Sequence, residues 1–293
     1  MSVVALSPPP IPPSNGKKPS PKPKPSAACS NRHDRAGHPL LFPIIGAPVA
    51  GVFSPPAFNA HFAAHGIAAR MDPIELAPDG LPAFLDLLRQ SPSFAGCSIT
   101  YPHKQAAFAG VDHHTDRAAR LGALNTIRRN PDGTLTGDAT DGAAICAAIL
   151  AKGGTISGKS ARILGAGGGA GQAIADALCT LGLSHIALDE TDPTRATLVR
   201  TLIETHWPDV TLLPTGSDAD ILINATTLGK SGDDPLPFNE PSIAAAEIVC
   251  DVVTHSTATP LVARAAAMHK PTVTGADMGA GQLAPQLAFL GLS

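Results

Sequence analysis

The sequence predicts an α/β protein with two domains, and three features lead to that prediction. Its 293 residues are enough for two domains of ordinary size. From Leu40 onward, short apolar stretches alternate with helix-forming segments, which is typical of a parallel sheet covered by helices. The alternation stops at the glycine-containing segment 153–158 and then begins again, so we place a domain boundary there.

The first 38 residues differ from the rest in composition. Prolines at 8–10 and 12–13 are followed by lysines that alternate with proline and serine. Such a segment favours extended polyproline conformations and cannot bury a core. We therefore expect a disordered N-terminal extension over residues 1–38, with a proline-rich docking segment as the alternative.

Composition argues against several classes of function. With a formal net charge of −3, a large nucleic-acid-binding surface is not expected. The longest apolar run, 143–151, is too short to span a bilayer. The five cysteines are scattered and form no CxxC pair. We therefore expect neither a disulfide framework nor a metal site, and we expect a reducing compartment such as the cytoplasm.

The first half is expected to begin with an apolar strand that ends at Gly46. Asp79 can cap the helix that follows it, and Asp141 can cap the long helix at the end of this half. The run Asn130-Pro131-Asp132-Gly133 predicts a hairpin turn. In order, the expected elements are strand 40–46, helix 57–65, strand 74–76, helix 81–89, strand 97–100, the hairpin strands 125–129 and 135–137, and helix 142–152.

The second half repeats the alternation of strands and helices. Asp192-Pro193 starts a helix with proline at its first position, and Thr259-Pro260 caps another. In order, the expected elements are strand 161–164, helix 172–181, strand 185–188, a helix from 192, strands 210–213, 221–224 and 248–253, helix 261–269 and a last helix over 278–290.

Lys104 is the only lysine between Pro25 and Ala151. Pro102 stops the preceding strand and can open a helix, so Lys104 should lie at the rim of a sheet, where α/β proteins bind ligands. A lysine there can donate to a substrate oxygen, and burial can lower its pKa into a range useful for proton transfer. A solvated surface lysine is the alternative.

A glycine-rich loop follows the first strand of the second half. The pattern Gly165-x-Gly167-x-x-Ala170 comes after an apolar strand and opens a helix, which is the context of the dinucleotide-binding fingerprint. Glycines let the backbone approach a pyrophosphate, and the helix N-terminus stabilises its charge. We therefore expect a nicotinamide coenzyme here rather than a flexible linker. The expected binding residues are Gly165, Gly167, Gly168, Gly169 and Ala170.

Two carboxylates follow the next strand at the distance that the fingerprint requires. Asp189 should end that strand and bind the ribose 2′-hydroxyl of the coenzyme, and Glu190 follows it. Both would repel a 2′-phosphate, and no basic residue precedes Arg195 in this loop. We therefore favour NAD over NADP as the cofactor. The alternative is that both carboxylates merely face solvent.

Several short motifs follow one another in a single order along the chain. They are Ser54-Pro55, Thr100-x-Pro102-x-Lys104, Gly122-Ala123-Leu124-Asn125-Thr126, Gly137-Asp138-Ala139-Thr140-Asp141-Gly142, the glycine loop with Ile223-Asn224-Ala225-Thr226, and Gly275-x-x-Met278-x-x-x-Gln282. With these motifs the chain resembles the shikimate/quinate dehydrogenase family over residues 42–290.

The resemblance implies a reversible hydride transfer between a nicotinamide cofactor and a ring hydroxyl or ketone of a cyclic hydroxy acid. The expected pairs are shikimate with 3-dehydroshikimate, or quinate with 3-dehydroquinate. Lys104 and Asp141 match the catalytic pair, in which the lysine takes the hydroxyl proton and the carboxylate positions it. Ser54, Thr100, Asn125 and Gln282 match substrate-binding positions, and Asn224, Thr226 and Gly275 match coenzyme-binding positions.

Two departures from the family pattern leave the substrate open. Val52 stands where the family has the first serine of Ser-x-Ser-Pro, and Thr254 stands where the family's Asp-x-x-Tyr segment often has its tyrosine. Both positions belong to recognition of the substrate carboxylate or a neighbouring hydroxyl. Where NADP users often carry Asn-Arg-Thr, this chain has Asp189-Glu190-Thr191, which again favours NAD.

The resemblance also implies a domain organisation. Residues 39–141 would form a three-layer α/β substrate domain, joined by a returning helix over 277–293, and residues 142–276 a Rossmann domain, with the site in the cleft between them. The partner is then a small hydroxy acid, and the chain a monomer or homodimer. Three alternatives remain: an aminoshikimate-type dehydrogenase, another cyclitol-acid dehydrogenase, and a non-catalytic sensor of such ligands.

Overall fold

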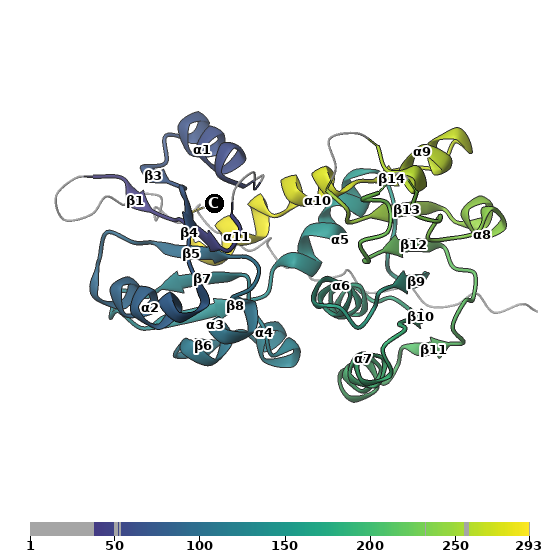
Figure 1. Ribbon diagram of the computed structural model, residues 1–293, viewed down its shortest axis with the longest axis horizontal. Helices are drawn as coiled ribbons and strands as arrows, with labels where there is room; N and C mark the ends of the chain where they lie inside the picture. Colours follow the sequence, from purple (N-terminus) through teal and green to yellow (C-terminus); the bar gives the residue numbers. More distant parts are fainter. Residues whose placement is uncertain (1–37, 50–51, 53, 232, 255–257, 293) are drawn as a thin grey trace, which may run out of the picture. The chain divides into compact units, whose positions relative to one another are not determined.

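The computed structural model describes residues 38–292 except 50–51, 53, 232 and 255–257. The proline- and lysine-rich extension therefore lies outside the described residues, apart from His38. The described chain contains two six-stranded sheets and a small two-stranded one, with helices along the larger sheets (Figure 1).

The first large sheet is mixed. Its strands lie in the order β4-β2-β5-β7-β8-β6, and β7 runs antiparallel to both of its neighbours. The alternation of elements predicts a parallel sheet, but the sheet is mixed. The predicted hairpin at Asn130–Gly133 is confirmed: a hydrogen bond from Gly133 N to Asn130 O closes it, and it makes β7 and β8 antiparallel. The strands are β2 Ile44–Gly46, β4 Pro73–Glu75, β5 Gly96–Ile99, β6 His113–His114, β7 Thr126–Arg129 and β8 Leu135–Asp138.

This sheet separates two apolar cores, as a three-layer fold requires. Successive strand residues point to opposite faces. Ile44 therefore packs with α1 (Ser54–His65) and α11 (Leu283–Leu290), whereas Ile45 packs with α2 (Leu81–Gln90) and its neighbours. The expected strand 40–46 is two strands, because β1 (Leu40–Leu41) leaves this sheet and pairs with β3 (Ala69–Arg70).

The predicted cap of α2 is wrong. Asp79 lies in a 3₁₀ turn, η1 (Pro78–Gly80), and Gly80 is the N-cap residue, with no side-chain hydrogen bond to the helix. The turn carries the chain into α2 and places Asp79 one residue too early to cap it. Two further helices follow β5, namely α3 (Lys104–Gly110) and α4 (Asp116–Leu121).

The second large sheet is wholly parallel. Its order, β11-β10-β9-β12-β13-β14, is the order 3-2-1-4-5-6 of a doubly wound dinucleotide-binding sheet. It confirms the predicted Rossmann architecture. The strands are β9 Ser160–Leu164, β10 His185–Asp189, β11 Thr211–Leu213, β12 Ile221–Asn224, β13 Ile248–Asp251 and β14 Thr272–Val273.

Helices cover both faces of this sheet. One core contains side chains of α6 (Gly169–Thr180) and α7 (Pro193–His206), and the other contains those of α8 (Glu240–Ala245) and α9 (Pro260–Ala267). The predicted cap of α9 is confirmed, because the Thr259 side chain accepts a hydrogen bond from Val262 N. No helix of the described chain is long and apolar enough to cross a membrane.

Three helices connect the two sheets. α5 (Asp141–Ala151) leads from β8 toward β9, and α10 (Gly275–Gly281) and α11 lead back to the first sheet (yellow in Figure 1). The predicted last helix is therefore two helices that meet at Gln282. α10 lies close to α5, since a Cβ atom on Gly281 would stand 2.5 Å from Ala144 O.

Candidate active site

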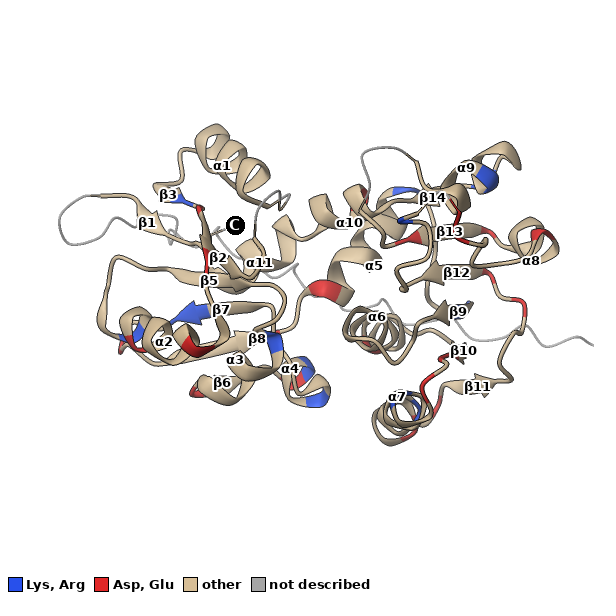
Figure 2. Cartoon of the chain, viewed as in Figure 1, with Lys and Arg blue, Asp and Glu red and all other residues tan. Residues whose placement is uncertain are grey.

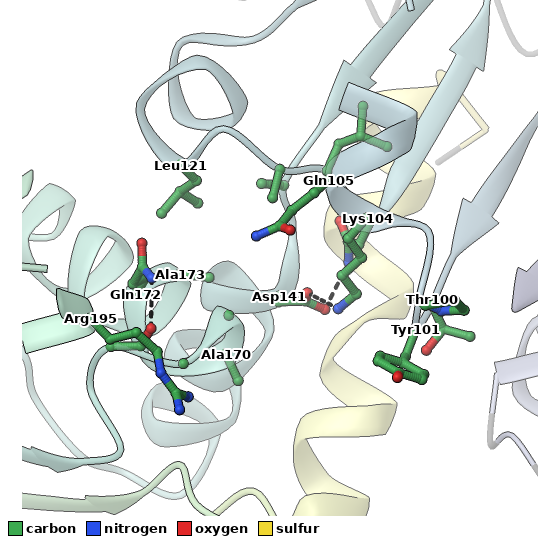
Figure 3. Close-up of a pocket in the computed structure, with 18 of the residues that line it drawn as sticks. Thr100, Tyr101, Lys104, Gln105, Leu121, Asp141, Ala170, Gln172, Ala173 and Arg195 are labelled. Atoms are coloured by element: carbon green, nitrogen blue, oxygen red, sulfur yellow. Dashed lines mark hydrogen bonds and ion pairs between the residues drawn. The ribbon is translucent and has the colours of Figure 1, made fainter. Parts of the chain in front are cut away.

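Lys104 and Asp141 face each other across the rim of the first sheet. Lys104 is the first residue of α3 and Asp141 the first of α5, where Figure 2 shows an acidic residue. Lys104 Nζ lies 2.5 Å from Asp141 Oδ2 (Figure 3). The lysine side chain is 37% exposed and the carboxylate 15%, so a ligand in the cleft can reach the ammonium group.

The prediction that Asp141 caps α5 is wrong. Thr140 is the N-cap residue, and the Asp141 carboxylate is turned to Lys104 instead. Burial raises the pKa of Asp141, but the Lys104 charge and hydrogen bonds from Lys104, Gln282 and Asn125 outweigh it and hold that pKa below its ordinary value. The carboxylate is therefore ionised near neutral pH.

Asn125 and Gln282 complete the surroundings of the carboxylate. Asn125 Nδ2 donates to Asp141 Oδ1 at 2.9 Å, and Gln282 Nε2 donates to the same oxygen at 2.7 Å. Asn125 is buried, and its Oδ1 accepts a hydrogen bond from Thr140 N at 2.7 Å. The structure thus brings together two of the residues that the sequence predicts for substrate binding, although from elements far apart in the chain.

A second buried carboxylate, absent from the sequence prediction, holds the turn before Asp141. Asp138 is 1% exposed, and it accepts hydrogen bonds from Arg117 Nε at 2.6 Å and from Thr115 Oγ1 at 2.6 Å. Its place in the motif 137–142 was the only signal for it. The network orients the turn that leads into Asp141.

Lys104 and Asp141 lie in a cleft of about 550 Å³ with walls from both halves of the described chain. Thr100 is among the residues that line it, beside Tyr101, a residue that is 73% exposed. Ser54, the first residue of α1, is not among the residues that line this cleft. From the first half the lining includes Thr100, Tyr101, Lys104, Gln105, Asn125 and Asp141, and from the second Gly167, Gly168, Gly169, Ala170, Gln172 and Arg195.

The glycine loop has the geometry of an anion-binding turn. Gly165 has a positive φ of 78°, and a Cβ atom on Gly167 would stand 2.6 Å from Arg195 Cβ, so both positions require glycine. Gly168 is the N-cap of α6 and offers no side chain to the first N–H groups of that helix, which leaves them for an anion. The loop therefore fits the pyrophosphate of a dinucleotide. Gln172, which the sequence analysis missed, donates to Gly167 O at 2.7 Å.

The two carboxylates after β10 differ in their surroundings. Asp189 is 4% exposed and accepts hydrogen bonds from Arg162 Nε at 2.7 Å and Gly216 N at 3.0 Å. Glu190 is only partly buried, and its carboxylate accepts a hydrogen bond from Gly167 N at 3.1 Å. The geometry therefore favours Glu190 over Asp189 as the carboxylate beside a bound coenzyme.

Of the predicted coenzyme residues, six are not among those that line the cleft: Gly165, Asp189, Glu190, Asn224, Thr226 and Gly275. Asn224 is fully buried and shapes the turn after β12, since its Nδ2 donates to Asp251 Oδ1 and its Oδ1 accepts from Thr226 Oγ1. Gly275 is buried at the start of α10. Among the residues that the structure describes, no group of three or more His, Cys, Asp or Glu side chains could hold a metal ion.

Comparison with known proteins identifies close relatives. A family model described as the shikimate dehydrogenase substrate binding domain matches residues 44–127. The chain is 38% identical to a shikimate dehydrogenase (NADP(+)) of Rubrobacter xylanophilus over 74% of its own length and 78% of the relative's. It is 36% identical to the shikimate dehydrogenase (NADP(+)) of Acidiphilium cryptum, covering 86% of this chain and 91% of that one.

Two solved structures share the fold. A shikimate 5-dehydrogenase from Listeria monocytogenes in complex with shikimate and NAD superposes with a TM-score of 0.79 at 25% identity, covering 90% of this chain and 95% of that one. The ligand-free 5-ketofructose reductase of Gluconobacter sp. strain CHM43 gives the same TM-score, 0.79, at 26% identity, covering 86% and 93%.

Proposed function

This chain belongs to the shikimate dehydrogenase family of nicotinamide-dependent oxidoreductases, and from that premise we propose that it interconverts shikimate and 3-dehydroshikimate, with quinate as a second cyclic hydroxy acid. One observation carries the proposal. The Lys104–Asp141 pair, 2.5 Å apart, lies in a cleft whose opposite wall is a glycine loop suited to a dinucleotide. A substrate in this cleft could then exchange a proton with Lys104 and a hydride with the coenzyme in the same site.

Lys104 moves the proton in this proposal. In reduction, the Lys104 ammonium donates a proton to the substrate carbonyl oxygen while the carbonyl carbon receives hydride; in oxidation, the neutral amine takes the hydroxyl proton back. A nicotinamide coenzyme, when bound, would supply or accept the hydride. Asp141, held by Asn125 and Gln282, orients the Lys104 side chain toward the substrate.

NAD is the proposed coenzyme, and the glycine loop with the N-terminus of α6 would hold its pyrophosphate. Glu190 supports NAD, because its carboxylate lies against Gly167 N, where it can accept a hydrogen bond from a ribose hydroxyl and would repel a 2′-phosphate. The relatives named above are NADP(+) enzymes, and Arg195 in the cleft lining is the cation that could meet a 2′-phosphate. Parallel assays with both coenzymes separate the two readings.

The test is the absorbance of reduced nicotinamide with shikimate or quinate and with NAD or NADP. We expect turnover of shikimate with NAD, and its loss in Lys104→Ala with NAD binding retained in calorimetry. Lys159→Ala is the matched control, because Lys159 pairs with Glu247 away from the cleft. An active Lys104→Ala variant would contradict the role of Lys104, and no turnover in any combination would contradict the proposed substrates.

A ketose without a carboxylate is the second candidate substrate. Val52 packs against an apolar core at the position where the family pattern has a serine. The cationic residues among the described cleft-lining residues are Lys104, which is already paired with Asp141, and Arg195. A substrate carboxylate would therefore find few cationic partners in this cleft. The similar reductase from Gluconobacter acts on 5-ketofructose by its name. Oxidation of NADH with 5-ketofructose but no reaction with shikimate would favour this candidate.

We propose the domain boundaries predicted from the sequence. Residues 39–141 with 277–293 would form the substrate domain, and 142–276 the coenzyme domain. Two observations support them: α5 begins at Asp141, and Leu287 and Leu290 of α11 pack in the core of the first sheet. A monomer or homodimer working in the cytoplasm is part of the same proposal, and the four free, buried cysteines of the described chain fit a reducing compartment.

A further inference from the structure

A buried ion pair joins the two halves at a distance from the catalytic pair. Arg120, in α4, donates from Nε to Asp176 Oδ1 at 2.7 Å and from Nη2 to Oδ2 at 2.9 Å. Asp176, in α6, has only 3% of its side chain exposed, and Arg120 has 18%. This two-point arrangement is the strongest geometry for such a pair, so the pair costs much to break.

Trp207 completes this bridge. Its indole Nε1 donates to Asp176 Oδ1 at 3.1 Å, and the Arg120 guanidinium lies 5.1 Å from the centre of its ring. Trp207 is also the sole tryptophan in the chain. Tryptophan fluorescence therefore reports on this one place. The three side chains, Arg120, Asp176 and Trp207, are called the interdomain bridge below.

The interdomain bridge connects elements that serve the two reactants. α4, basic in Figure 2, also carries Arg117, whose pairing with Asp138 holds the turn before Asp141. α6 begins at the glycine loop. The Arg120–Asp176 pair joins the half that contains the first sheet to the half that contains the second. Among the ion pairs between described residues, it alone does so once the pairs that involve the connecting helices α5 and α10 are set aside.

Apolar packing beside the bridge is incomplete. A crevice of about 290 Å³ lies between α4 and the helices α5 and α6, and Arg120, Asp176 and Cys146 are among the residues that line it. Beside this crevice, the ion pair links α4 directly to α6 by two hydrogen bonds.

We propose that Arg120 and Asp176 are positioning residues, which hold α4 against α6 and thereby set the distance between the bound coenzyme and the Lys104–Asp141 pair. This inference rests on the proposed hydride transfer. Hydride transfer is sensitive to this distance, and a displacement of about 1 Å can lower a rate by about 100-fold. None of the three bridge side chains is among the residues that line the cleft, so the bridge would act through the geometry of the cleft alone.

The test compares Arg120→Lys with wild type. Lysine keeps the charge but loses the two-point contact and the stacking on Trp207. With shikimate and NAD we expect kcat to fall by about 10- to 100-fold, with a larger isotope effect for substrate deuterated at the reacting carbon and an unchanged KM for NAD. Acrylamide should quench Trp207 more strongly in the variant. Arg200→Lys is the matched control, because Arg200 forms an exposed pair within α7.

Each outcome decides for or against the bridge. A folded Arg120→Lys variant with wild-type kcat and isotope effect overturns the proposal, as does an equal loss in Arg200→Lys. If Arg120→Lys does not fold, Asp176→Asn, which keeps an oxygen for Trp207, takes its place under the same criteria. If wild type does not turn over shikimate, the proposed function fails separately. In that case acrylamide quenching of Trp207, measured with and without NADH, tests the bridge on its own. Equal quenching in Arg120→Lys and in wild type would overturn the bridge.

Discussion

Asp141 keeps its charge at a position where burial opposes it. Burial favours the neutral acid, yet the Lys104 ammonium and three hydrogen bonds stabilise the carboxylate more, so its pKa lies below the ordinary value. A lowered pKa means that the folded state binds the proton less readily than the unfolded state does. The charged pair therefore stabilises the fold above the ordinary carboxyl pKa, and that contribution is lost as the pH falls through the lowered value.

This sign gives a prediction for Asp141→Asn. Its free energy of unfolding should depend less on pH than that of wild type below about pH 4, the ordinary range for aspartate, because the variant has one carboxylate fewer to protonate. Urea unfolding at a series of pH values for both proteins measures the difference. Other carboxylates with lowered pKa values, such as Asp112 and Asp220, are common to both proteins and cancel. A steeper acid dependence in the variant would contradict the assignment.

Single residues show where sequence reasoning succeeds and where it stops. Lys104 was found from its isolation and its place after a strand, because those are local features. The local pattern gave Asp141 the wrong role, a helix cap, because nothing near it in the sequence marks a lysine partner 37 residues away; only the family resemblance paired it with Lys104. Asp189 has the spacing for a ribose contact, but Arg162 on the neighbouring strand occupies its carboxylate.

The glycine loop is the element on which coenzyme binding should depend most. In Gly167→Ala the new Cβ would lie 2.6 Å from Arg195 Cβ and 2.9 Å from Arg195 O. These atoms belong to the backbone of Arg195 or are attached directly to it, so a change of side-chain rotamer cannot relieve the clash. The loop would have to shift, and we expect the affinity for NAD to fall by at least about tenfold, or about 1.4 kcal/mol. Calorimetric titration with NAD measures it.

The comparison variant for that prediction is Gly169→Ala. A Cβ atom at Gly169 would have no neighbour within 4 Å, so its effect on NAD affinity should be clearly smaller. Equal losses in the two variants would mean that the loop needs glycine for flexibility rather than for space.

Whole elements were predicted well where one local pattern sets them. Five of the six strands of the second sheet, all but β14, follow from apolar runs, and the caps of α7 and α9 follow from Asp or Thr before proline. The strand at 40–46 and the last helix were each predicted as one element but are two. β1 leaves the sheet to pair with β3, and the chain between α10 and α11 breaks at Gln282, which faces Asp141. Partners distant in the sequence decide both breaks.

At the scale of the molecule, the sequence predicted the two sheets but not the contacts between their halves. The order of the second sheet follows from its glycine fingerprint and strand–helix alternation. The Arg120–Asp176 pair joins residues 56 apart, and neither stands in a motif that marks it. Such contacts depend on how finished elements meet, so only the assembled fold shows them.

The meeting of α10 with α5 gives the last prediction, for Gly281→Ala. In an open helix this change would stabilise the protein by about 0.5–1 kcal/mol. Here the added Cβ would stand 2.5 Å from Ala144 O, a backbone atom of α5, and pushing two helices apart costs about 1–3 kcal/mol. Because Gln282 follows directly and donates to Asp141, the shift should lower kcat as well.

Thermal unfolding and shikimate turnover of Gly281→Ala test this together. Gly80→Ala is the matched control, because its Cβ would meet only the flexible side chain of Leu76. We expect a lower Tm and a lower kcat for Gly281→Ala than for Gly80→Ala. A raised Tm with unchanged kcat would mean that α10 can move away from α5 without disturbing Asp141, and that the connecting helices do not help to hold the active site.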